Sequence, residues 1–173
     1  MAIRTILHYP DKRLRNPGRP VTEFGPELEK LVEDMAETMY AAPGVGLAAT
    51  QIGEPLRLFV IDIAQGEDQP SDLKVFVNPE ILERHGSQIW EEGCLSFPGV
   101  HEEIERAERV KVRAQDVKGK HFELEADGLL AVAIQHEYDH LEGKLMIDHL
   151  GLIRRRIVHR QMTKRAAAAE AAQ

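Results

Sequence analysis

The feature that most constrains the fold is an apolar segment, residues 129–134, that runs directly into the polar sequence His136-Glu-Tyr-Asp-His140. Asp127-Gly128 before this segment and Gly143 after it are typical of helix boundaries. A helix that is apolar on every side has to be surrounded by other elements. We therefore predict a buried central helix whose second half carries ionisable side chains.

Within the polar sequence, His136 and His140 lie four residues apart, so a helix places them on one face, about 40° apart. Glu137 falls within the same arc of about 100°. The pattern H-E-x-x-H is typical of metallohydrolases, in which the histidines bind the metal and the glutamate transfers protons. A solvated helix face is the usual alternative, but an apolar helix leads into this motif, and burying its polar groups without partners is costly. The context therefore favours a metal site.

The rest of the chain predicts strands and two further helices. Apolar residues recur at helical spacing after Pro26 and stop at Pro43-Gly44, which predicts an amphipathic helix. Alternating apolar and polar residues predict short strands at 56–62, 74–77, 80–84, 110–113 and 121–125. Because strands precede helices without regular βαβ alternation, we expect an α+β fold. Antiparallel or mixed β-sheets would pack around the central helix, and a C-terminal helix would follow.

Length and charge limit the organisation and the partners. The 173 residues fit one domain, residues 1–173, because no repeat and no Pro- or Ser-rich linker divides them. The net charge is −7; from Leu150 onward six cationic residues against one glutamate give +5, which leaves −12 for residues 1–149. The acidic majority argues against DNA binding, and no apolar run is long enough for a membrane span. One cysteine and no pattern of a secretory signal indicate the cytoplasm.

Two histidines leave a catalytic metal one protein ligand short of the usual three. Cys94 is the leading candidate, because no histidine or glutamate cluster after His140 fits the common third-ligand patterns. Its surroundings, Glu91-Glu-Gly-Cys-Leu-Ser-Phe-Pro-Gly99, are interpreted as a turn-rich loop. The alternative is a small buried apolar side chain, the more frequent fate of a free cysteine. The residues alone leave both open.

A third segment, Gly44-Val-Gly-Leu-Ala-Ala-Thr-Gln-Ile-Gly53, is rich in glycine but lacks the spacing of a phosphate-binding loop. It is either an ordinary turn after a helix or a strand with small side chains whose backbone pairs with a peptide. In the second case Gln51 would present an amide donor at its end. The pattern does not decide between the two.

Together the three segments resemble the three motifs of the peptide deformylases: Gly44-x-Gly-Leu-Ala-Ala-x-Gln51, Glu92-Gly-Cys-Leu-Ser96 and His136-Glu-x-Asp-His140. The resemblance spans essentially the whole chain. It implies an enzyme, a metal-dependent hydrolase that removes the N-formyl group from the formylmethionine of nascent proteins and releases formate. It also implies a divalent metal held by Cys94, His136 and His140, with Fe²⁺ favoured and Zn²⁺, Ni²⁺ or Co²⁺ possible.

The resemblance further implies roles for catalytic groups near the metal. Glu137 would take the proton of the attacking water and deliver it to the departing amine. The Gln51 side-chain amide and the Leu95 backbone N–H would hold the developing oxyanion. Glu92 and Asp139 would support the site, the former with a partner at Arg106.

Substrate binding would need an apolar pocket for methionine and a backbone track for the residues after it. The backbone of Gly44, Val45 and Gly46 is the candidate track. Candidate pocket walls close to the ligands in sequence are Trp90, Leu129, Val132 and Ala133. Plain core packing is the alternative for each of these side chains.

Other functions remain in competition with the first. A metallopeptidase is the runner-up, since H-E-x-x-H serves amide hydrolysis generally; the contexts of Cys94 and Gln51 argue against it. A second alternative is a non-catalytic, ribosome-associated module with a structural metal. Glu137 argues against this alternative, because a structural metal site needs no proton carrier. The basic helix predicted at 152–169 is expected to dock near the ribosomal exit tunnel, unless it is merely solvated. Its cationic residues are Arg154, Arg155, Arg156, Arg160, Lys164 and Arg165.

Overall fold

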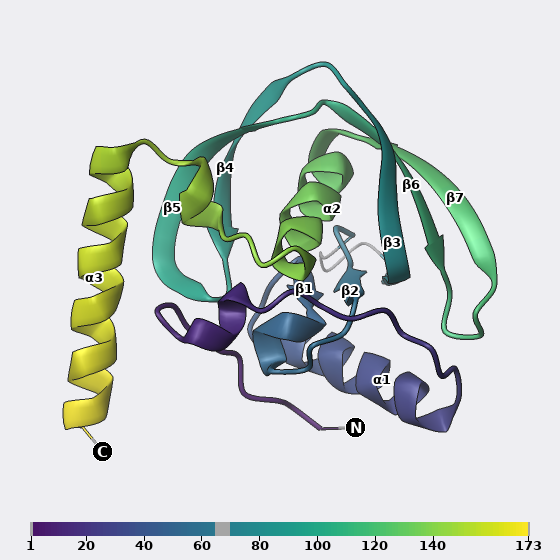
Figure 1. The fold of residues 1–173 in the computed structure, drawn as a ribbon, viewed down its shortest axis with the longest axis horizontal. Helices are drawn as coiled ribbons and strands as arrows, with labels where there is room; N and C mark the ends of the chain where they lie inside the picture. The colour runs from purple at the N-terminus through teal and green to yellow at the C-terminus, as the bar shows by residue number, and fades with distance from the viewer. Residues whose placement is uncertain (1, 65–69, 173) are drawn as a thin grey trace.

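The computed structural model describes residues 2–64 and 70–172 and consists of three α-helices, three short 3₁₀ helices and seven strands (Figure 1). The helices are α1 (Pro26–Ala41), α2 (Gly128–Leu141) and α3 (Leu152–Ala171), and the 3₁₀ helices are η1 (Lys12–Arg15), η2 (Ala49–Ile52) and η3 (Met146–His149). The strands are β1 (Gly46–Ala48), β2 (Leu58–Ile61), β3 (Lys74–His85), β4 (Gln88–Cys94), β5 (Phe97–Arg106), β6 (Arg109–Gln115) and β7 (His121–Asp127).

The strands form two antiparallel sheets around α2. One sheet has the order β1-β2-β3-β6-β7, and the other is the β4-β5 hairpin. Figure 1 shows α2 lying in the hollow between them. Apolar residues of α2, such as Ile134 and Leu141, share a core with Phe59 and Phe76 of the larger sheet. The expected α+β fold around a central buried helix is therefore confirmed.

Helix α1 packs on the opposite side of β1 and β2. Pro26 occupies its first turn, where the missing proline N–H costs nothing, and the helix ends just before Pro43-Gly44, as expected. Met35 and Met39 are completely buried against strand residues that include Leu58. This second core holds β1 against the rest of the sheet.

Two predicted strands, 74–77 and 80–84, are in fact one, because β3 continues through Asn78-Pro79. Asn78 has a φ of 50°, which Asn tolerates better than most residues, and the register with β6 shifts at this point. The Asn78 side chain accepts the Val21 N–H at 2.7 Å and donates to the Val21 carbonyl at 2.9 Å. Val21 is 57 residues away from Asn78 in sequence. The local pattern therefore indicates only a break in the strand at Asn78-Pro79.

The loop predicted around Cys94 is also wrong, because this region forms the hairpin β4-β5. Glu92 lies opposite Glu102, Gly93 lies opposite His101, and the chain turns after Cys94. The glycines of this segment, Gly93 and Gly99, favour a turn-rich loop when the segment is considered alone. The backbone N–H and C=O groups of the two strands hydrogen-bond to each other. This pairing depends on the partner strand, so the local propensity of the segment does not predict it.

Helix α3 confirms the predicted C-terminal helix and lies along one side of the molecule, outside β5 (Figure 1). Val158 and Met162 are buried in a third core together with Phe97 and Ile147. The Tyr9 hydroxyl and His159 Nδ1 form a hydrogen bond that ties α3 to the N-terminal segment. Among the helices of the described residues, none has the length and apolarity that crossing a membrane requires.

Candidate metal and active site

Hairpin β4-β5 and helix α2 bring the three candidate ligands together. Cys94 ends β4, while His136 and His140 lie one turn apart on the same face of α2. One ligand atom from each residue lies within 4.8 Å of the other two, and Cys94 Sγ is 3.5 Å from His140 Nε2. The two imidazole rings are 5.1 Å apart between centroids. The thiol that the sequence left ambiguous therefore faces both histidines.

Buried ion pairs hold His136 in place. Its Nδ1 lies 2.9 Å from Glu92 Oε1, and Glu92 receives two hydrogen bonds from Arg106, at 2.6 and 3.0 Å. Arg106 also donates to Asp139 at 3.0 Å, and Asp139 lies 2.7 Å from His149 Nε2. Because Nδ1 is engaged with Glu92, the Nε2 atom of His136 is left to act as a ligand. The expected contact between Arg106 and Glu92 is present, and His149 is a member that the sequence did not indicate.

The acidic members of this network are held ionised. Burial raises the pKa of Asp139, but hydrogen bonds from His149 and Arg106 outweigh it and lower the pKa to about 2. Burial likewise raises the pKa of Glu92, and its bonds to His136 and Arg106 more than compensate. A buried charge network of this kind is stable only when every member keeps its partners.

The cluster fits a divalent metal. Burial lowers the pKa of His140 well below its usual value, so this imidazole is neutral, as a ligand must be. Burial also lowers the pKa of His136, but the neighbouring Glu137 and Cys94 raise that pKa by more, so the pKa of His136 is above its usual value. Negative charge is thus concentrated where a cation would lie. One sulfur and two nitrogen donors suit Fe²⁺, Zn²⁺, Co²⁺ or Ni²⁺.

Glu137 lies beside the cluster, and one of its carboxylate oxygens is available to act on a substrate or a water molecule. Its Oε1 is buried and has no hydrogen-bond partner among residues 2–64 and 70–172. Burial raises the pKa of Glu137 to about 7, against the opposing charges of His136 and Arg106. A carboxyl group with this pKa can both accept and return a proton near neutral pH.

Gln51 presents its amide nitrogen to the same place. The residue lies in η2, directly after β1, so the glycine-rich segment is a short strand followed by a turn. Gln51 Oε1 accepts the Ala48 N–H at 2.9 Å, which turns Nε2 toward Ser96 Oγ at 3.0 Å and Cys94 Sγ at 3.6 Å. The amide is therefore a fixed donor at the edge of the cluster.

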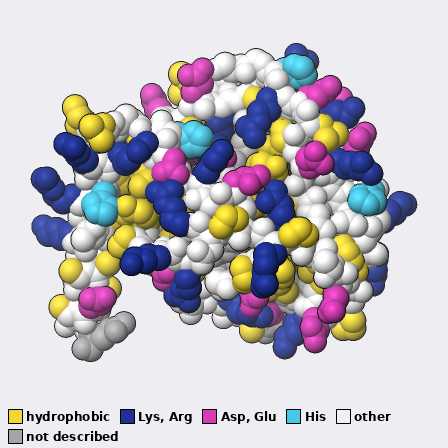
Figure 2. Space-filling view, in the orientation of Figure 1, with side chains coloured by type: hydrophobic (Ala, Val, Ile, Leu, Met, Phe, Trp, Pro, Cys, Tyr) yellow, Lys and Arg dark blue, Asp and Glu magenta, His cyan; other side chains and the backbone are white. Residues whose placement is uncertain are grey.

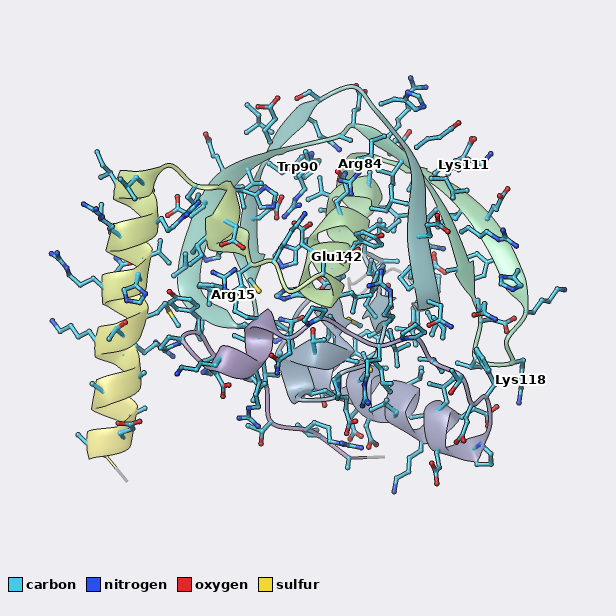
Figure 3. The ribbon with its side chains drawn as sticks, in the orientation of Figure 1. Arg15, Arg84, Trp90, Lys111, Lys118 and Glu142 are labelled. Atoms are coloured by element: carbon cyan, nitrogen blue, oxygen red, sulfur yellow. The ribbon has the colours of Figure 1, made fainter. Side chains whose placement is uncertain are left out.

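A cavity of about 570 Å³ opens onto the cluster. All the predicted substrate-binding residues line it: Gly44, Val45, Gly46, Trp90, Leu129, Val132 and Ala133. Trp90, labelled in Figure 3, belongs to β4 and lines the cavity from that strand. Leu95, in the turn of the hairpin, lies against Gly44, where an added Cβ would be 2.7 Å from Leu95 Cδ1.

Other residues of the cavity wall were missed by the sequence analysis. They include Ile6 and His8 from the N-terminal segment, His101 from β5 and Arg165 from α3. None of them belongs to a motif. Ile6 and His8 lie 88 and 86 residues before Cys94, and Arg165 lies 25 residues after His140. No signal in the sequence associates them with the site.

A Cys/His/His cluster with buried histidines, a proton-accepting glutamate and a fixed amide donor meet at one cavity, as in a metal-dependent amide hydrolase. Residues 3–156 match the sequence profile of a family described as polypeptide deformylase. The chain therefore belongs to the peptide deformylase family, enzymes that remove the N-formyl group from nascent peptides.

Individual relatives agree with this assignment. A peptide deformylase of Chromobacterium violaceum is 50% identical over 165 residues, covering 95% of this chain and 97% of its own. The crystal structure of a peptide deformylase from Legionella pneumophila has a TM-score of 0.90 at 47% identity and covers 99% of both chains. A structure from Thermotoga maritima has a TM-score of 0.81 at 43% identity and covers 87% of this chain and 99% of its own.

Proposed function

We propose that residues 1–173 act as one deformylase domain in which Cys94, His136 and His140 hold the catalytic metal. The observation that carries the proposal is the convergence of their three ligand atoms within 4.8 Å, beside Glu137, whose Oε1 has no hydrogen-bond partner in the described part of the chain. Fe²⁺ is the favoured ion, with Zn²⁺, Ni²⁺ and Co²⁺ as alternatives. When bound, the metal would polarise the formyl oxygen and lower the pKa of water.

Glu137 is the proton carrier of the proposed reaction. With a pKa of about 7, it takes a proton from the attacking water and delivers it to the amine nitrogen as the C–N bond breaks. Formate and a free methionyl N-terminus result. The Gln51 Nε2 donor and the Leu95 backbone N–H stabilise the negative charge that develops on the formyl oxygen.

The substrate peptide is proposed to lie along β1. This strand is at the edge of the larger sheet, and an extended peptide can add to such an edge through its backbone. Gly44, Val45 and Gly46 form the cavity wall there. The methionine side chain would contact the apolar walls Trp90, Leu129, Val132 and Ala133. Binding through backbone atoms suits an enzyme that has to accept many N-terminal sequences.

The basic face of α3 is proposed to contact the ribosome in the cytoplasm, where nascent chains emerge. A groove of about 660 Å³ between α3 and the protein body is lined by Arg15, Arg155, Arg156, Arg160 and Lys164. Figure 2 shows lysine and arginine side chains gathered along α3, and Arg15, labelled in Figure 3, belongs to η1 and pairs with Asp148 of η3. Clustered cations of this kind attract RNA phosphates while the acidic remainder is repelled.

Two measurements test the catalytic proposal. Protein purified without oxygen should contain one equivalent of divalent metal per chain and should release formate from a formyl-Met tripeptide. Release of free amino acids instead of formate would favour a metallopeptidase and contradict the proposal. Metal-replete protein that releases neither product would also contradict it.

The ribosome contact needs substitutions rather than truncation, because Val158 and Met162 of α3 are buried in the core. Arg156→Glu combined with Lys164→Glu should weaken co-sedimentation with ribosomes, and wild-type binding should fall steeply with salt. Arg113→Glu combined with Lys120→Glu, two exposed positions on or just after β6, is the control of equal charge change. Equal co-sedimentation of the double variant and the wild type would contradict a docking role.

A further inference from the structure

The N-terminal segment bridges two of the motifs through its backbone. Leu7 N–H donates to the Gln51 carbonyl at 2.7 Å, and Tyr9 N–H donates to the Ser96 carbonyl at 2.9 Å. Leu7 is buried, and Tyr9 stacks on Phe97 with ring centroids 5.0 Å apart. His8 lies between them in this extended stretch, and its side chain lines the active-site cavity.

Helix α3 brings an arginine to the same wall. Arg165 lies seven residues after Val158 and three after Met162, so it falls within about 60° of these two residues on the helix surface. The two are buried against the protein body, which turns this face of α3 inward. An apolar residue is expected at such a position, yet here the cationic side chain of Arg165 reaches the cavity wall.

The position of α3 is fixed by contacts on either side of this face. Tyr9 and His159 share a hydrogen bond, and Arg155 donates to the carbonyls of Ile147 and Asp148, each at 3.2 Å. Arg154 and Glu102 form an ion pair between α3 and β5. Arg165 therefore extends from a docked helix, not from a free tail.

Arg165 carries a positive charge to the cavity wall. No carboxylate among residues 2–64 and 70–172 forms an ion pair with it. Burial lowers the pKa of His8, and the charge of Arg165 lowers it further, so His8 stays neutral beside it. The exposed carboxylate on the cavity wall, Glu91, comes from β4 next to Trp90, on a different element. The wall thus carries a cation on the α3 side and an anion on the β4 side.

We propose that Arg165, placed beside His8, is a specificity-determining residue that binds a carboxylate of the substrate downstream of the formylmethionine. The inference rests on the proposed function, because the metal cluster and the apolar walls near Trp90 account for the formyl group and the methionine. The peptide extended along β1 continues past the methionine within the same cavity, where His8 of the N-terminal segment and Arg165 of α3 line part of the wall. The carboxylate is either an acidic side chain or, in a short peptide, the C-terminus.

Matched peptides test this subsite through formate release. Formyl-Met-Ala-Asp amide and formyl-Met-Ala-Asn amide differ only in a side-chain carboxylate, and formyl-Met-Ala-Ser as free acid and as amide differ only in a terminal one. For at least one pair, wild-type protein should prefer the carboxylate about threefold in kcat/KM, through KM, as expected for an exposed ion pair. The pair that shows the preference identifies the source of the carboxylate.

The variants assign the preference to Arg165. Arg165→Gln should bring the ratio within that pair close to one, and Arg165→Lys should retain most of it. Arg113→Gln, which removes the same charge from β6, should leave the ratio at its wild-type value. A wild-type ratio of one for both pairs, or a preference that survives in Arg165→Gln, would overturn the subsite and leave the proposed function standing. Absence of formate from every peptide would overturn both.

Discussion

Gly46 lies directly against Glu137, and a Cβ atom at position 46 would come within 2.6 Å of Glu137 Oε2. It would also lie 3.0 Å from Cδ and 3.1 Å from Cγ of the same side chain. Glu137 is buried, so it has little room to swing aside. The glycine of the first motif thus leaves the space that the carboxylate of the third motif occupies.

The substitution Gly46→Ala should therefore displace Glu137 and lower kcat/KM by about tenfold or more, because small errors in the placement of a proton carrier are costly. The measurement is formate release at matched metal content. Gly151→Ala is the control, since an added Cβ there meets nothing within 4 Å. Wild-type activity in Gly46→Ala would show that Glu137 can move without loss.

Replacing Glu137 by Gln should retain the metal but lower turnover by about 10²- to 10⁴-fold, since the amide has the same shape and cannot accept a proton. Metal content and formate release are measured on one preparation. Glu142→Gln makes the same chemical change at the exposed end of α2 (Figure 3) and should keep its activity. Near wild-type turnover of the metal-loaded Glu137→Gln protein would exclude the proton-carrier role.

Cys94→Ala and His136→Ala should each lose the bound metal, because two protein ligands hold a catalytic ion much less firmly than three. Elemental analysis after dialysis measures the loss. His121→Ala, exposed on β7, should keep the wild-type metal content. Stoichiometric metal in either ligand variant would mean that the assigned ligand set is wrong.

Arg106→Met should destabilise the protein by about 3–5 kcal/mol, because it leaves Glu92 and Asp139 buried without their shared cation. Urea unfolding monitored by circular dichroism gives the free energy of unfolding. Arg113→Met removes an exposed arginine and should change that free energy by less than about 0.5 kcal/mol. Similar values for the two variants would show that the buried network contributes little to stability.

The ion pair between Arg15 and Asp148 should make a pH-dependent contribution to the free energy of unfolding. Burial raises the pKa of Asp148, but its bonds to Arg15 and to the Leu145 N–H outweigh burial and lower it. The carboxylate therefore stabilises the fold above its unfolded pKa of about 4, and this contribution disappears as the pH falls through the lower folded pKa.

Accordingly, Asp148→Asn should reduce the free energy of unfolding by up to about 1 kcal/mol at pH 7, a small value because the pair is partly exposed. Urea unfolding at pH 7 and at successively lower pH should show the difference from wild type shrinking. A difference that stays constant down to pH 2 would contradict ionisation as its cause.

Local sequence patterns predict much of the architecture. The boundaries of α1 follow from Pro26 and Pro43-Gly44, and the burial of α2 follows from its uniformly apolar first half. The common face of His136 and His140 needs only the helical repeat. These features depend on neighbours within a few residues, so the sequence by itself determines them.

Contacts between distant segments were decided only by the tertiary structure. Cys94 meets His140 because β4 pairs with β5 and the hairpin packs on α2, and His149 joins Asp139 through the turn after that helix. Arg165 reaches the cavity because Val158 and Met162 dock α3 on the protein body. Strand register and packing depend on all the partners at once, so no single stretch of sequence encodes them.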